Sequence, residues 1–161
     1  MTIPRYEYRL VLNAAPLAAR RPPAGSSVRI PDADDVETLA DLMLDAYRGT
    51  LDYDDETLED ARSEVARYFA GSPLLDCSGV CVADDRVLSA SLLGLWRDRD
   101  CPIVSYVMTG ADRKNRGLAS LLLARSLARL AEAGYPEVRA VITEGNGPSE
   151  AVFARAGFLR V

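Results

Sequence analysis

The sequence predicts one domain of the α/β (α+β) class. Apolar residues recur at helical spacing over about 35–47 and 55–70, and an Ala/Leu/Arg-rich helix is expected over about 118–133. Between the second and third helices the pattern changes to strand-like runs. At 161 residues the chain is long enough to bury a core without disulfides or metal.

Start and stop signals separate these elements. A short strand at 28–30 leads into Pro31-Asp-Ala-Asp34, which caps the first helix, and Gly49 ends that helix. Gly71 follows the second helix. Further strands are expected over 79–83, 86–95, 103–109 and 137–144, with an Asp84-Asp85 turn and a charged loop at 96–102 between the first three.

The first 26 residues are expected to stand apart from a domain at 27–161. Residues 6–13 alternate like a strand, with Tyr6, Tyr8, Leu10 and Leu12 on one face. The next residues are rich in Pro, Gly and Ser, a composition typical of a linker.

Composition narrows the class of protein. Hydrophobic residues make up 48% and charged residues 27%, without an apolar run of ~18 residues or a signal-peptide core. The net charge of −5 argues against nucleic acid as the main partner. Arginine supplies all but one of the 19 basic residues, which suggests a GC-rich bacterial genome. We expect a cytoplasmic protein, monomer or homodimer, that does not bind membranes.

Zinc fingers and histidine-based triads are excluded, and we expect no metal site. The chain has no histidine, and Cys77, Cys81 and Cys101 lack the spacing of metal ligands. We expect these cysteines to be reduced, partly buried thiols.

The stretch from Ser105 to Ser120 carries the strongest functional signal. A strand enters a basic turn that Gly117 closes, and a helix follows, so unpaired main-chain N–H groups and the helix dipole are expected to face an anion such as a pyrophosphate. The pattern G-x-x-x-x-G-K-[ST] is absent, which excludes a Walker NTPase, and G-x-G-x-x-G is absent, which disfavours a Rossmann site. A basic surface turn before an ordinary helix is the alternative.

Two motifs resemble the GNAT superfamily of N-acetyltransferases. Lys114-Asn-Arg-Gly117-Leu-Ala119 is similar to its acetyl-CoA loop, (Gln/Arg)-x-x-Gly-x-(Gly/Ala), with lysine in the first position. Asn146 to Phe158 is similar to its closing signature, Asn-x-x-(Ala/Ser)-x-x-(Leu/Val)-Tyr-x-x-x-Gly-Phe, with Phe153 in place of tyrosine. The resemblance implies a mixed central sheet flanked by helices in the order β-α-α-β-β-β-α-β-α-β.

The resemblance implies an acetyl-CoA-dependent N-acetyltransferase in which an amine attacks the thioester directly. The expected acetyl-CoA contacts, partly through the main chain, are Val107, Met108, Thr109, Lys114, Asn115, Arg116, Gly117, Leu118, Ala119, Ser120, Asn146 and Phe153. Glu144 is the candidate base, directly or through a water, and a solvated strand-end carboxylate is its alternative interpretation. Because phenylalanine cannot donate a proton, Ser149, Tyr106 or water would protonate the thiolate, or no acid is needed.

The acceptor is expected beside the first two helices. Between Asp45 and Asp60 there are seven carboxylates and one arginine, which favours a cationic amine of a small molecule. A non-catalytic acyl-CoA-binding module of the same fold is the alternative, and transfer to a protein N-terminus or lysine is a further one.

The two ends of the chain depart from the family pattern. The family's closing strand is missing after Phe158-Leu-Arg-Val161, whereas the strand at 6–13 is surplus. We hypothesise that the surplus strand fills the vacant place beside 137–144, from the same chain or from a neighbouring subunit, so that Leu10 and Leu12 are buried.

Overall fold

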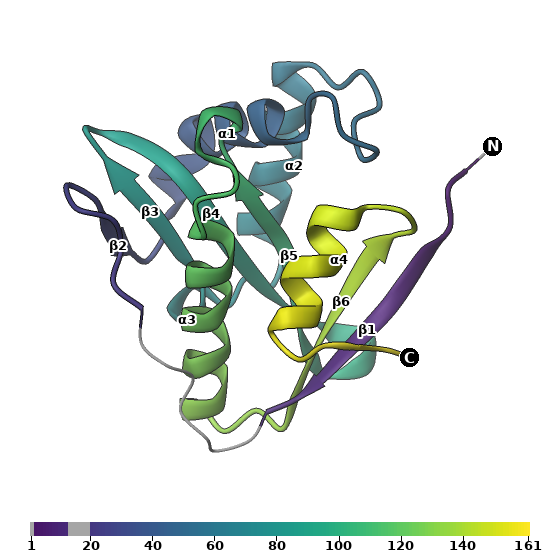
Figure 1. The fold of residues 1–161 in the computed structure, drawn as a ribbon. Helices are drawn as coiled ribbons and strands as arrows, with labels where there is room; N and C mark the ends of the chain where they lie inside the picture. Colours follow the sequence, from purple (N-terminus) through teal and green to yellow (C-terminus); the bar gives the residue numbers. More distant parts are fainter. Residues whose placement is uncertain (1, 13–19) are drawn as a thin grey trace.

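The computed structural model describes residues 2–12 and 20–161, in which seven strands form one sheet with helices on both faces (Figure 1). The strands are β1 Arg5–Val11, β2 Ser27–Arg29, β3 Gly79–Ala83, β4 Arg86–Trp96, β5 Cys101–Thr109, β6 Glu137–Thr143 and β7 Leu159–Arg160. The α-helices are α1 Val36–Tyr47, α2 Leu58–Ala70, α3 Leu118–Glu132 and α4 Gly147–Arg155. From β2 onward, the element order predicted from the sequence is confirmed.

The sheet is mixed and has the order β2-β3-β4-β5-β6-β1-β7. Neighbouring strands are antiparallel except β5 and β6, which are parallel. In Figure 1, α3 and α4 lie in front of the sheet and α1 and α2 lie behind it. The predicted fold, a mixed sheet flanked by helices, is therefore confirmed.

Each face of the sheet has its own core. Apolar residues at helical spacing on α1 and α2 pack on the rear face, including Leu39, Met43 and Val65 against Ala90, Leu92 and Met108. On the front face the core includes Leu123, Leu127, Leu130, Val138, Ala140, Phe153 and Phe158. Burial of each large aliphatic side chain stabilises the fold by about 1.5–3 kcal/mol, so the two cores fix the helices on the sheet.

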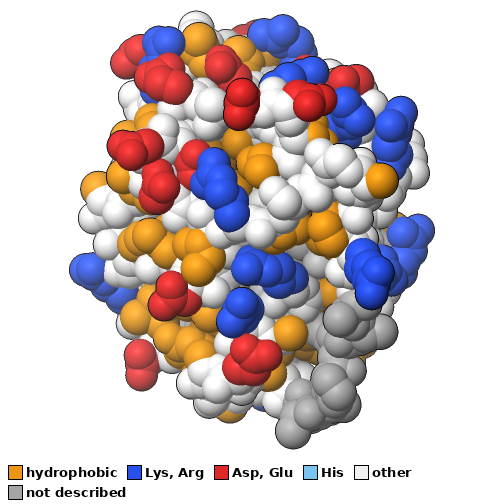
Figure 2. Space-filling view, turned by 90° about the vertical axis from the view of Figure 1, so that its left-hand side faces the viewer, with side chains coloured by type: hydrophobic (Ala, Val, Ile, Leu, Met, Phe, Trp, Pro, Cys, Tyr) orange, Lys and Arg blue, Asp and Glu red, His pale blue; other side chains and the backbone are white. Residues whose placement is uncertain are grey.

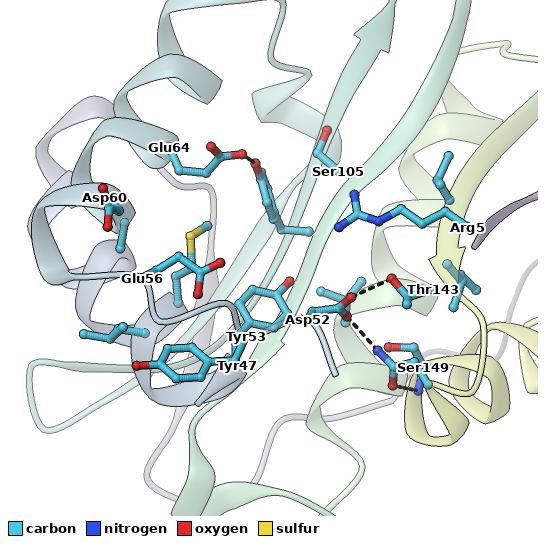
Figure 3. Close-up of a pocket in the computed structure, with 18 of the residues that line it drawn as sticks. Arg5, Tyr47, Asp52, Tyr53, Glu56, Asp60, Glu64, Ser105, Thr143 and Ser149 are labelled. Atoms are coloured by element: carbon cyan, nitrogen blue, oxygen red, sulfur yellow. Dashed lines mark hydrogen bonds between the residues drawn. The ribbon is translucent and has the colours of Figure 1, made fainter. Parts of the chain in front are cut away.

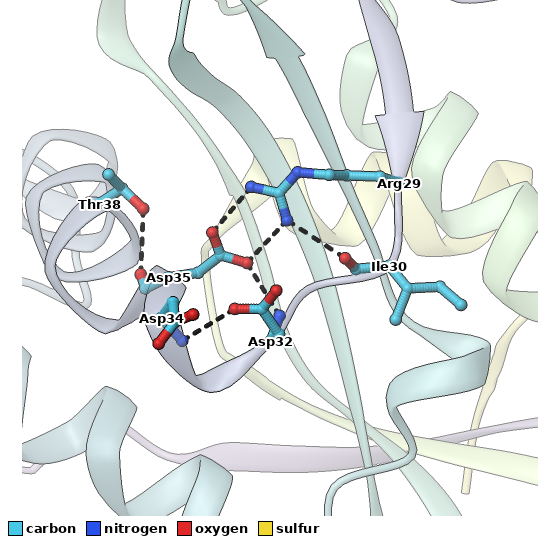
Figure 4. Close-up of polar contacts among 6 residues, drawn as sticks. All are labelled: Arg29, Ile30, Asp32, Asp34, Asp35 and Thr38. Atoms are coloured by element: carbon cyan, nitrogen blue, oxygen red, sulfur yellow. Dashed lines mark hydrogen bonds and ion pairs between the residues drawn. The ribbon is translucent and has the colours of Figure 1, made fainter.

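An ion pair joins β2 to the start of α1 (Figure 4). The Arg29 guanidinium donates to both carboxylate oxygens of Asp35 at 2.8 Å, and Asp35 also accepts from the main-chain N–H of Asp32. Hydrogen bonding from Arg29 lowers the pKa of the Asp35 carboxyl from its ordinary value, with a smaller opposing effect of burial. The chain turn at 32–35, a 3-10 turn at Ala33–Asp35 and its cap, is thus locked against the sheet.

Helix α2 begins at Leu58, three residues later than the sequence pattern suggests. Asp55 has a left-handed backbone, with φ at 55°, and so cannot belong to the helix. Thr57 caps the helix: its hydroxyl oxygen accepts from the N–H of Asp60, and the Asp60 carboxylate accepts from the N–H of Thr57. Elsewhere the differences are small, since β5 starts two residues earlier than expected.

Strand β1 occupies the place predicted for it beside β6. It pairs antiparallel along all of β6, from Arg5 opposite Thr143 to Val11 opposite Glu137, and β7 pairs with its other edge. Leu10 and Leu12 are half-buried rather than buried, because the neighbour beyond β1 is the two-residue strand β7. Residue 13 of the predicted strand and residues 14–19 of the predicted linker lie outside the described residues.

Within the described part of the chain, no helix combines the length and apolar character needed to cross a membrane. Figure 2 shows one face of the molecule, on which acidic and basic side chains are interspersed among small hydrophobic areas.

Candidate active site

The turn before α3 leaves the N-terminus of that helix open. Gly117 has a φ of 79° and provides no side-chain cap, and the first turn of α3 carries no acidic residue. The first helical bond runs from the N–H of Leu121 to the Gly117 carbonyl at 3.0 Å, so the N–H groups of 118–120 have no acceptor within the helix. A Cβ at Gly117 would meet nothing within 4 Å. Donors, dipole and open space together suit an anion.

The basic side chains of this turn differ in their surroundings. The Lys114 ammonium donates to the Ala46 carbonyl at 2.8 Å, and the Ala111 N–H donates to the Asp45 carboxylate at 2.9 Å. These two bonds tie the turn to the last residues of α1, where a cation is favourable. Arg116 is exposed and makes no hydrogen bond or ion pair within residues 2–12 and 20–161, which leaves its charge available to a ligand.

Strands β5 and β6 separate soon after they meet. Their one paired position is Ile103 opposite Arg139, and the register of β4 on β5 shifts so that Ser105 is the extra residue of a bulge. A bulge bends its strand and increases the local twist, which accounts for the divergence of β5 from β6. The end of β5 therefore exposes main-chain groups on the side facing β6.

The direction of those groups follows from the pairing with β4. The Gly110 N–H donates to the Leu88 carbonyl, and the Met108 carbonyl accepts from the Ser89 hydroxyl at 2.7 Å, so both residues turn their main chain toward β4. Because successive residues alternate, the main-chain groups of Val107 and Thr109 point toward the gap. The structure thus brings Val107 and Thr109, but not the main chain of Met108, to the predicted position.

A cavity of about 590 Å³ opens where the strands separate (Figure 3). Its walls come from α1 and α2, the α1–α2 connection, the ends of β5 and β6, α4 and the residue Arg5 of β1. The polar residues that line it are Arg5, Tyr47, Asp52, Tyr53, Glu56, Asp60, Ser63, Glu64, Arg67, Ser105, Tyr106, Thr143, Asn146 and Ser149. A cavity of this volume is within the range of small-molecule sites.

Asp52 lies at the junction of the cavity with the separated strands. One of its carboxylate oxygens accepts from the Thr143 hydroxyl at 2.6 Å, and the other accepts from the side-chain amide of Asn146 at 2.8 Å. Asn146 in turn caps α4, because its side-chain oxygen accepts from the Ser149 N–H. Asp52 therefore connects the α1–α2 segment to the end of β6 and the start of α4.

Glu64 and Tyr106 form a second polar group on the α2 side. The Tyr106 hydroxyl donates to the Glu64 carboxylate, whose other oxygen lies 3.1 Å from Arg67. Burial, followed by the hydrogen bond to Glu64, raises the pKa of the Tyr106 hydroxyl above its ordinary value. Burial raises the pKa of Tyr47, which also lines the cavity, in the same direction. Both phenols therefore stay protonated at neutral pH.

The structure separates the predicted site residues into two groups. Val107, Asn146, Ser149 and Phe153 line the cavity, whereas the residues 114–120 form the turn and the first turn of α3. Phe153 is also buried in the front core, with its ring centroid 5.0 Å from that of Phe158.

Glu144 lies apart from both groups. It is exposed, is not among the lining residues, and accepts a hydrogen bond from the Tyr6 hydroxyl at 3.3 Å. Its role as the base stays a prediction.

Sequence reasoning placed the acceptor near residues 47–57, which contribute Asp52, Tyr53 and Glu56 to the cavity. It missed Glu64 and Arg5. The sequence did contain a signal for Glu64, because it lies four residues after Asp60 and therefore on the same face of the helix. For Arg5, the predicted pairing of the N-terminal strand with 137–144 was the signal, because it places the start of that strand beside the end of β6.

An open helix N-terminus lies beside two separating parallel strands, with a cavity at their junction, and this arrangement suits a phosphate-bearing ligand next to a small molecule. The family model for the acetyltransferase (GNAT) domain matches residues 27–159, and this chain belongs to that family. No curated protein sequence matches the chain significantly.

Solved structures share this fold. A GCN5-related N-acetyltransferase from Sphaerobacter thermophilus has a TM-score of 0.75 at 17% identity, over 98% of this chain and 48% of that one. The chain thus spans about half the length of that protein. The protein PH1933 from Pyrococcus horikoshii OT3 has a TM-score of 0.71 at 15% identity, over 84% of this chain and 90% of that one. PaiA N-acetyltransferase from Thermoplasma acidophilum, solved with coenzyme A, has a TM-score of 0.67 at 15% identity, over 83% of this chain and 89% of that one.

Proposed function

We propose that this domain transfers the acetyl group of acetyl-CoA to a primary amine of a small molecule by direct attack in a ternary complex. The observation that carries the proposal is the cavity, which joins the exposed main chain of β5 to a wall of carboxylates from the α1–α2 region. An amine can reach the strand gap from one side while acetyl-CoA occupies the side of α3.

The acetyl-CoA site is assigned to the turn and the strand gap. The unpaired N–H groups of 118–120 and the exposed Arg116 would hold the pyrophosphate, and Gly117 leaves room for it. The pantetheine amides would pair with the free edge of β5 as an added strand does. The Val107 N–H, which points into the gap, would polarise the thioester carbonyl and stabilise the oxyanion that forms on it.

Asp52 is the best-placed carboxylate to remove a proton from the amine. It lies at the strand gap, where it accepts from Thr143 and Asn146, and two donors leave lone pairs of the carboxylate free. Glu144, the base expected from the sequence, would have to act from outside the cavity through water. We therefore propose Asp52 as the base, acting directly or through one water.

Ser149 is the proposed donor of the proton to the leaving thiolate. It lies one helical turn before Phe153, so the two residues share a face of α4, and both line the cavity. A hydroxyl is thus present on the same face as the residue that replaces the tyrosine of the family signature. Tyr106 is less suited because its hydroxyl already donates to Glu64.

The test is thiol release from acetyl-CoA with a library of primary amines. Asp52→Asn should lower kcat by ~10²–10⁴-fold, whereas Glu144→Gln should change kcat by less than about threefold. The reverse ranking would return the base to Glu144. If the protein binds acetyl-CoA but releases no thiol with any amine, the domain is a binding module and the proposal is wrong.

A further inference from the structure

Arg5 is the one cation of the cavity wall that comes from β1. Its backbone pairs opposite Thr143, and Figure 3 shows its guanidinium reaching from the strand side into the cavity. The carboxylates of Glu56 and Glu64 enter the same cavity from the α2 side. The cavity therefore has a guanidinium on its β1 side, while its α2 side holds these carboxylates together with Arg67.

Arg5 also differs from the other arginines of its surroundings in having no partner. Arg67 pairs with Glu64, and Arg9 and Arg139 pair with Glu137. The exposed Arg5 guanidinium makes no hydrogen bond or ion pair to any residue that the structure describes. A guanidinium presents a planar fork of donors that matches a carboxylate, and this fork is free.

The carboxylates of the cavity are occupied to different degrees. Asp60 is used in the cap of α2, and Glu64 binds Tyr106 and Arg67. Asp52 and Glu56 each keep lone pairs, since two donors bind the first and one main-chain N–H binds the second. An ammonium group can therefore be held by carboxylates near the strand gap while a second group of the same molecule lies at Arg5.

We infer that the acceptor is a zwitterion, an amino acid or a similar small molecule, whose carboxylate binds Arg5 while its amine faces Asp52 and the strand gap. A polyamine or another simple cation would bring positive charge against Arg5, which the unpaired guanidinium disfavours. This inference rests on the proposed function, since it names the acceptor of the same site. It also gives β1 a direct part in substrate recognition.

The experiment compares amino acids with their carboxamides, which keep the side chain and the amine but lose the carboxylate. For the 161-residue chain with acetyl-CoA, kcat/KM is measured for the twenty amino acids and the matching amides. Because acid and amide differ in the basicity of their amines, the decisive quantity is how their ratio changes between wild type and variants. Arg5→Gln should lower that ratio ~10–100-fold, mainly through KM, and Arg5→Lys should retain part of it.

Arg9→Gln is the matched control. Arg9 lies four residues after Arg5 and on the same face of β1, so this variant removes the same charge from a position outside the cavity lining. This variant should keep the wild-type ratio, and thermal denaturation should show both variants folded.

Binding by calorimetry in the presence of coenzyme A separates the inference from the proposed function. Arg5-dependent binding of an amino acid without thiol release would support the inference and contradict the proposed function. Acetylation of amines with an acid-to-amide ratio that Arg5→Gln leaves unchanged would contradict the inference alone. Absence of both binding and turnover across the panel would overturn both.

Discussion

Two glycines at opposite ends of α3 allow a matched test of the acetyl-CoA site. Gly117 before the helix has a φ of 79°, and Gly134 after it has a φ of 86°. A Cβ at either position would meet nothing within 4 Å, so substitution brings backbone strain without a clash. That strain is about 1–2 kcal/mol for an L-residue, or about 2–8 °C in Tm for a domain of this size.

We expect both Gly117→Glu and Gly134→Glu to lose stability, Gly134→Glu by more because the helix dipole disfavours a carboxylate at a helix C-terminus, but only Gly117→Glu to lose affinity for coenzyme A. At Gly117 the new carboxylate lies over the N–H groups that hold the pyrophosphate. Each charge-assisted hydrogen bond contributes about 1.5–3 kcal/mol, so the loss of two of them should raise the Kd for coenzyme A at least ~10²-fold. Both variants gain one negative charge, so a difference between their Kd values for coenzyme A reports where the charge lies and not the change in net charge.

The assay is calorimetric titration with coenzyme A, together with thermal denaturation of each variant. Equal Kd values for the two variants would refute the assignment of the turn as the pyrophosphate site. Weaker coenzyme A binding by Gly117→Glu alone, with a Tm loss no larger than that of Gly134→Glu, would support it, because lost stability could then not explain the loss of binding.

Two further predictions concern stability. Arg29→Met should lower the free energy of unfolding by about 1–2 kcal/mol at pH 7, because it removes a paired guanidinium from Asp35. The pKa of Asp35 is lower in the folded state than in the unfolded state, so the ion pair stabilises the fold above the unfolded-state pKa and stops doing so as pH falls through the folded-state pKa. Urea denaturation from pH 7 to 2 should therefore show the free energies of unfolding of the two proteins starting to converge below about pH 4. Deletion of residues 1–26 should expose the edge of β6 and part of the front core and cause unfolding or aggregation; a monomeric deletion variant with wild-type activity, by size-exclusion chromatography and thiol release, would contradict the role given to β1.

Most elements of the fold follow from local sequence, because helical spacing and strand alternation report which face each element buries. The capping pair Thr57 and Asp60 shows the limit of this reasoning. Their spacing identifies a helix start, yet the acidic residues just before it would also suit the first turn of a helix, and the left-handed backbone of Asp55 excludes them. Boundaries depend on such single residues.

The candidate site was predictable where main-chain geometry decides it and less so where side chains do. The turn around Gly117 follows from a glycine before a helix. The position of the Lys114 side chain does not follow from the local sequence, because its ammonium donates to the carbonyl of Ala46, which is 68 residues away in sequence. Glu64 and Arg5 likewise enter the cavity only through packing of distant elements. The spacing of Asp60 and Glu64 and the expected pairing of the N-terminal strand place these residues on the correct elements, but local patterns do not show that the two side chains meet in one cavity.

The position of β1 between β6 and β7 also sets an order of events during synthesis. Arg5 and its partner Thr143 are separated by 138 residues, which at ~5–20 residues per second is roughly 7–28 s of translation. β1 is synthesised first and cannot pair until β6 has been synthesised. Pairing between segments so distant in sequence slows folding. Meanwhile Arg5, Glu7 and Arg9 place charges on one side of an otherwise apolar strand, which guards it against pairing with another chain. The β1 side of the cavity can therefore form only after β6 has been synthesised.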